Sequence, residues 1–145
     1  MDAERIRTML LELPHVVETM QWGANLVFWV GDKAIGGKMF ALVDLDGNGG
    51  PVICYAAGSE HYAELLDQEG FLPAPYFARI HWIAVERWDA MTPQQWRQEL
   101  EAARALTHTK MPRRVRESLE LPPRELRRLI AEKRKSAASK SAKKR

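Results

Sequence analysis

The sequence has little of what several functional classes require. Cys54 is the single cysteine among 145 residues, which excludes an internal disulfide and any zinc or iron–sulfur site built from several cysteines. None of the four histidines lies two to four positions from another histidine or from the cysteine. No apolar run approaches the roughly 18 residues that span a bilayer. We therefore expect no bound metal, no cofactor and no membrane association.

Signatures of export and of catalysis are also missing. Asp2, Glu4 and Arg5 stand where a secretory signal needs an apolar run, so we expect a cytoplasmic protein. The glycine-rich segment 47–50 lacks the Lys-Ser/Thr of a phosphate-binding loop and precedes a strand rather than a helix, which favours a hairpin turn. Ser59 has no Gly-x-Ser-x-Gly elbow around it. The sequence therefore predicts no enzyme activity.

What is present indicates one globular α+β domain. Apolar residues make up 46% of the chain and charged residues 28%, as in globular proteins. Short apolar segments separated by glycine-rich turns predict an antiparallel meander over 16–22, 26–30, 39–45 and 52–55, with a further strand over 81–87. The segment 71–77 contains two prolines and is expected to be an extended loop. Helices are expected over 3–13, 59–69, 93–106, 112–121 and 123–135.

Charge is divided unevenly along the chain. Residues 1–91 hold 6 Lys and Arg against 13 Asp and Glu, whereas residues 92–145 hold 16 against 6. An acidic body with a basic end is expected of a protein that meets a polyanion with one part of its surface. A solvated helix whose glutamates form local ion pairs would give the same count, so this alternative stays open. Residues 136–145 contain only Ser, Ala, Lys and Arg and are expected to be disordered.

Seven short segments occur in an order that resembles the MmcQ/YjbR family. They are Leu13–Glu18, Trp22-Gly23, Phe28–Gly31, Gly37–Ala41, Pro73–Tyr76, His81-Trp82 and Lys110–Arg116. The resemblance covers residues 1 to about 119 and implies a CyaY-like α+β fold, with an antiparallel sheet and helices packed on one face. It also implies DNA binding, because members are described as having a "double wing" arrangement of β-hairpins. Iron binding, which the CyaY-like comparison brings up, needs clustered carboxylates that the first helix does not supply.

We accordingly divide the chain into an α+β domain at 1–119, a basic helical extension at 120–135 and a disordered tail at 136–145. The first functional hypothesis is a DNA-binding domain without catalysis, in which cations contact phosphates. The residues expected to do so are Lys110, Arg113, Arg114 and Arg116, with Lys33 and Lys38 reaching from a hairpin.

The alternative is a small-molecule or protein-binding module with an aromatic pocket. Its lining is expected to be Trp22, Tyr76, His81 and Trp82. The two hypotheses are separated by whether these aromatic side chains are buried against one another or rim an open concavity. The sequence leaves the oligomeric state open, and a monomer is the simplest expectation.

Overall fold

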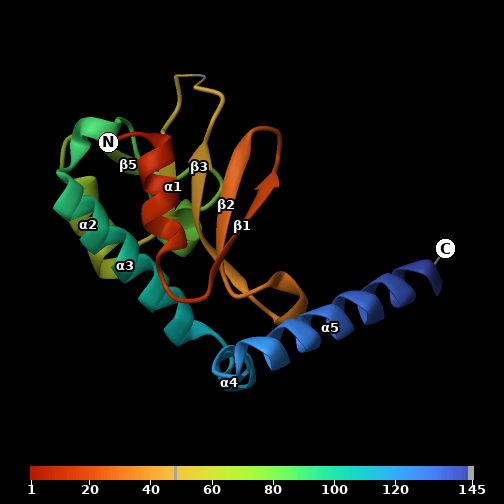
Figure 1. Ribbon diagram of the computed structural model, residues 1–145. Coiled ribbons are helices and arrows are strands. Elements are labelled where there is room, and N and C mark those ends of the chain that lie inside the picture. The colour runs from red at the N-terminus through yellow and green to blue at the C-terminus, as the bar shows by residue number, and fades with distance from the viewer. Residues whose placement is uncertain (48, 144–145) are drawn as a thin grey trace.

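The computed structural model describes residues 1–47 and 49–143, which form a six-stranded antiparallel sheet with five α-helices (Figure 1). The strands are β1 (Val16–Gln21), β2 (Asn25–Val30), β3 (Lys38–Asp44), β4 (Ile53–Ala56), β5 (Phe71–Pro73) and β6 (Trp82–Val85). The helices are α1 (Ala3–Leu11), α2 (Ser59–Leu66), α3 (Pro93–Lys110), α4 (Arg113–Leu119) and α5 (Pro123–Lys143). Short 3-10 turns are η1 (Lys33–Ile35), η2 (Ala78–Ile80) and η3 (Trp88–Ala90). The strand order β1-β2-β3-β4-β6-β5 confirms the α+β class and the four-strand meander.

The helices cover one face of the sheet, as expected. Alternate strand residues such as Phe28 and Ile83 point to this side, where they join Leu10 of α1, Trp96 of α3 and Val115 of α4 in one buried cluster. Burying such large apolar side chains is the main source of stability in a domain of this size.

The opposite face of the sheet is covered by a loop rather than by a helix. Cys54, Ala74, Trp82 and Ala84 belong to a second, smaller cluster on this side. Phe77, from the segment between β5 and β6, lies with its ring centroid 4.9 Å from that of Trp82. Because strand residues alternate between faces, Trp82 and Ala84 point away from the helices while Ile83 and Val85 point toward them. Most strand side chains on this side are buried and others, such as Met39 and Leu42, are partly buried; because no described helix is part of this cluster, we call this side the open face of the sheet.

Two elements differ from the sequence prediction. Residues 71–73, expected in a loop, form the edge strand β5, which pairs with β6. An edge position tolerates Pro73, because only one side of an edge strand needs its ladder hydrogen bonds. Helix α3 starts as predicted, with a capping box between Thr92 and Gln95, but it continues beyond residue 106 to Lys110. Residues 106–111 contain neither glycine nor proline, and the first residue that breaks a helix is Pro112.

Helix α5 is also longer than predicted. We expected it to end near residue 135 and the rest to be disordered, whereas the helix continues through Lys143. Its last turns contain alanine, lysine and serine without glycine or proline, and alanine and lysine favour helix. Residues 144 and 145 of the expected tail lie outside the described residues. None of the described helices combines the length and the apolar character that a membrane span requires.

Candidate functional site

Positively charged side chains gather around the turn between β2 and β3. Lys33 belongs to η1, and its ammonium lies 5.9 Å from the centroid of the Trp29 ring. Lys38 starts β3 and lines a pocket of about 430 Å³ together with Lys110, from the end of α3, and with Trp29. Three of the predicted phosphate ligands, Lys33, Lys38 and Lys110, are thus brought to one end of the sheet although they come from distant parts of the chain.

Helices α4 and α5 add further cations at this turn. Arg114 and Lys133 line a second pocket of about 290 Å³ with Gly36. Arg134 forms an ion pair with Asp32, whose other carboxylate oxygen caps η1 by accepting from the Ala34 N–H. We call this set the cationic end. It consists of Lys33, Lys38, Lys110, Arg114, Lys133 and Arg134.

The turn owes its shape to two adjacent glycines. Gly36 has a φ of +95°, which L side chains rarely adopt. A Cβ on Gly37 would lie 2.0 Å from the carbonyl oxygen of Gly31, so only glycine fits there. The Gly37 N–H also donates to the Asp32 carbonyl at 2.9 Å. This close approach of the two backbone segments folds residues 31–38 into a compact turn against α4 and α5. The backbone positions of Lys33 and Lys38 are thereby fixed.

The predicted arginines of α4 have three different environments. Arg113 is exposed and pairs with Glu117 at 2.8 Å, which reduces its availability to a phosphate. Arg114 is exposed at the cationic end. Arg116 is half-buried, and its Nε donates to the Met111 carbonyl at 3.1 Å, so it stabilises the link between α3 and α4. Burial lowers the pKa of the neighbouring His108, and Arg104 and Arg116 lower it further, which reflects the positive field in this region.

Helix α5 presents a row of cations that are not among the site residues predicted from the sequence. Leu126, Leu129 and Ile130 pack this helix against the domain. Residues three and four positions apart share one side of a helix, so the side turned away from this apolar stripe is basic. We call it the basic α5 face; its members, all exposed, are Arg124, Arg127, Arg128 and Lys135. The 3- and 4-residue spacing of these cations was the signal that could have identified them.

The four aromatic residues predicted to line one pocket are divided among three places. Trp82 is 4% exposed and belongs to the buried cluster under Phe77. His81 packs edge-on against Tyr62 of α2, with ring centroids 5.5 Å apart. Trp22 and Tyr76 are highly exposed and line a groove of about 540 Å³ on the open face of the sheet. The predicted single pocket is therefore wrong, but two of its members do rim an open concavity.

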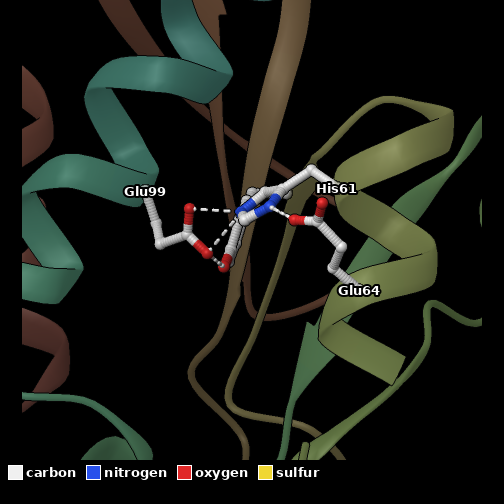
Figure 2. A network of polar contacts seen from close by, with 4 residues as sticks. His61, Glu64 and Glu99 are labelled. Atoms are coloured by element: carbon white, nitrogen blue, oxygen red, sulfur yellow. Dashed lines mark hydrogen bonds and ion pairs between the residues drawn. The ribbon is translucent and has the colours of Figure 1, made fainter. Parts of the chain in front are cut away.

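A histidine with two carboxylate partners, not predicted from the sequence, joins α2 to α3 (Figure 2). The Nε2 of His61 lies 2.6 Å from a carboxylate oxygen of Glu99, and its Nδ1 lies 3.2 Å from Glu64. The buried Tyr55 hydroxyl donates to the same Glu99 at 3.2 Å. Burial lowers the pKa of His61, but the hydrogen bonds to Glu99 and Glu64 outweigh this and raise it above its ordinary value.

This arrangement is suited to holding two helices together rather than to proton transfer. Both ring nitrogens face carboxylates, so an imidazolium donates on both sides and has no lone pair with which to take a proton from a substrate. His61 and Glu99 are 38 positions apart in the chain, which is why no local pattern revealed the pair.

Comparisons with known proteins agree on the fold. A crystal structure of the Deinococcus radiodurans protein DR2400, a DUF419 domain, matches with a TM-score of 0.69 at 24% sequence identity. The match covers 82% of this chain and 88% of that one. None of the curated proteins matches the chain. Residues 11–106 match the family described as YjbR, and this range includes all six strands, α2 and most of α3. The chain therefore belongs to the YjbR family.

Proposed function

We propose that the protein binds nucleic acid, DNA in the first instance, through the phosphate backbone and without catalysis. The observation that carries the proposal is the convergence of cations from β3, α3, α4 and α5 on the turn 31–38, next to the basic α5 face. Cations held close together on a folded frame bind phosphates and release the counterions that screen them, which drives association with nucleic acid.

The dimensions of α5 fit a duplex. The basic α5 face extends over 11 residue steps, from Arg124 to Lys135, or about 17 Å along the helix axis, which corresponds to roughly five base pairs at 3.4 Å per step. Figure 1 shows α5 extending past the sheet, so its outer side is not shielded by the domain. Arg124, Arg127 and Arg128 on that side are forked donors that suit phosphate oxygens, and Arg128 also lies 3.8 Å from a carboxylate oxygen of Glu132.

The hairpin tips do not support a role as phosphate-binding wings. Residues 21–25 and 45–51, which connect β1 to β2 and β3 to β4, contain no lysine or arginine, and Asp44 and Asp46 stand at the second tip. A phosphate backbone is repelled by these carboxylates. We therefore assign the contacts to the cationic end, which includes the turn of the β2–β3 hairpin, and to the basic α5 face rather than to the other two hairpins.

Salt-titrated binding of a fluorescent DNA duplex tests the proposal. We expect the logarithm of the association constant to fall linearly with the logarithm of salt concentration between about 50 and 200 mM. The triple variant R124Q/R127Q/R128Q should lower the slope by about 2 to 3 units, because each lost phosphate contact removes about 0.9.

The matched control removes the same charge from other exposed positions. The variant R5Q/R79Q/R97Q has the same net charge as the test variant but changes arginines outside the cationic end and the basic α5 face. It should bind like the wild type. Equal decreases in DNA affinity in the two triple variants would show that only the net charge of the protein determines binding. Absence of salt-dependent binding by the wild type would refute the proposal. Cytoplasmic location and a monomeric state belong to the same proposal; light scattering after gel filtration tests the second.

A further inference from the structure

The groove on the open face of the sheet plays no part in the proposed nucleic-acid binding. Trp22, in the turn between β1 and β2, and Tyr76, in the loop between β5 and β6, form its walls. Leu42, Cys54 and Phe77 contribute its apolar surface, and Asp44 lies at the end where β3 stops. Its volume of about 540 Å³ lies in the range of small-molecule sites. We call it the aromatic groove.

The two aromatic walls are exposed at a conformational cost. Trp22 is 60% exposed and Tyr76 is 95% exposed, although both side chains are large and partly apolar. Both residues also have a positive φ, +49° and +66°, which is uncommon for bulky residues and costs free energy. The side-chain amide of Asn25 donates to the Trp22 carbonyl at 2.7 Å and so helps to hold this turn. Two aromatic residues with strained backbone line the same groove, and strained residues cluster at ligand-binding sites.

The charge in the groove is negative. Asp44 is half-buried, and one of its carboxylate oxygens accepts from the Asp46 N–H at 2.9 Å, which fixes its position. In the described part of the chain no lysine or arginine lines the groove. Burial raises the pKa of the Cys54 thiol to about 12, and the negative charge of Asp44 contributes to that rise. The negative charge of Asp44 would also disfavour a second anion in the groove and would attract a cation.

From this combination we infer that the aromatic groove binds a small organic cation, an ammonium or guanidinium group carried on a flat apolar body. The cation would pair with Asp44 and lie against the faces of Trp22 and Tyr76, which attract positive charge through their ring quadrupoles. The apolar body would cover Leu42 and Phe77 and displace water from them. This inference does not depend on the proposed nucleic-acid binding, because the cationic end lies at the other end of β3.

Two probes of the same size separate charge from shape. Phenethylamine combines a phenyl ring with an ammonium group, and phenylacetate replaces that group with a carboxylate. Binding is followed by the indole resonance of Trp22 in two-dimensional ¹⁵N–¹H spectra of the full chain. We expect phenethylamine to shift this resonance and to bind at least about tenfold more tightly than phenylacetate, a difference of about 1.4 kcal/mol.

Paired variants identify the groups responsible. D44N should reduce phenethylamine binding to the level of phenylacetate, while its amide oxygen can still accept from the Asp46 N–H. D46N changes an exposed neighbour that does not line the groove and should leave binding unchanged. Y76A, at a 95% exposed position, should fold normally and weaken binding. Equal binding of the two probes, an unaffected D44N variant, or absence of any shift at Trp22 would each overturn the inference.

Discussion

Replacing Gly37 with alanine should destabilise the protein by about 2–3 kcal/mol, because the added methyl group meets backbone rather than a movable side chain. An ideal Cβ on Gly37 would lie 2.0 Å from the Gly31 carbonyl oxygen, 2.5 Å from its carbonyl carbon and 2.7 Å from the Asp32 oxygen. All three atoms belong to the same turn, so relief requires the turn to open. Opening would lengthen the hydrogen bond from the Gly37 N–H to the Asp32 carbonyl, now 2.9 Å.

The magnitude follows from two opposing effects. Overpacking against a rigid neighbour costs typically about 1–3 kcal/mol, occasionally more, and three backbone contacts below 3 Å place Gly37→Ala at the upper end. Alanine restricts the unfolded chain and returns about 0.4–1 kcal/mol. With a urea dependence of about 1–3 kcal/mol per molar, a loss of about 2–3 kcal/mol should lower the unfolding midpoint by about 0.7–3 M.

Gly50→Ala is the matched control. A Cβ at Gly50 meets nothing within 4 Å, and its φ lies outside the left-handed region. This variant should unfold at the wild-type midpoint or slightly above it, since only the unfolded state is affected. A difference of less than about 0.3 M between the unfolding midpoints of the two alanine variants would show that the turn is not closed as described. It would also refute the conclusion that this turn fixes the positions of Lys33 and Lys38.

Three further predictions concern the core and its titratable groups. Folding raises the pKa of His61, so the charged imidazolium stabilises the folded protein below the ordinary pKa, and this stabilisation is lost as the pH rises through the raised pKa. H61Q should therefore lower the melting temperature more at about pH 5.5 than at about pH 9. Equal decreases in melting temperature at the two pH values would contradict this. Iodoacetamide at about pH 8 should modify Cys54, with its pKa of about 12, at least about a hundredfold more slowly in the folded protein than in guanidinium, and similar rates would refute the assigned burial. Trp96 is fully buried and stacks on Trp88 at 5.6 Å, so W96A should cost about 3–5 kcal/mol in urea unfolding; a loss below about 1 kcal/mol would contradict this packing.

The fold could be predicted where local chemistry determines the element. The alternating segment 81–87 predicted a strand, found as β6, and the capping box of Thr92 and Gln95 located the start of α3. Element ends were less predictable, because they depend on tertiary pairing. Strand β5 exists because β6 offers it a partner, and the proline-containing segment 71–73 gives no sign of this on its own.

The candidate sites could be predicted only in part, since they are assembled from distant segments. Arg134 and Asp32 are 102 positions apart, and their ion pair joins α5 to η1. The sequence correctly marked the C-terminal third as basic, but it could not show that Arg116 binds its own backbone or that Arg113 is paired. Trp82 and Tyr76 looked equivalent as aromatic residues near prolines and strand ends. Only the register of β6 and the left-handed φ of Tyr76 make one buried and the other exposed.

Strand β3 explains how one small sheet can carry two sites of opposite charge. It starts at Lys38, in the cationic end, and stops at Asp44, in the aromatic groove. Six steps of about 3.3 Å along β3 separate Lys38 from Asp44 by about 20 Å, more than twice the screening length of about 8 Å at physiological salt. The attraction of each end for its proposed ligand is therefore scarcely weakened by the opposite charge at the other end. A chain with a net charge of only +3 can in this way offer a phosphate backbone one surface and an organic cation another.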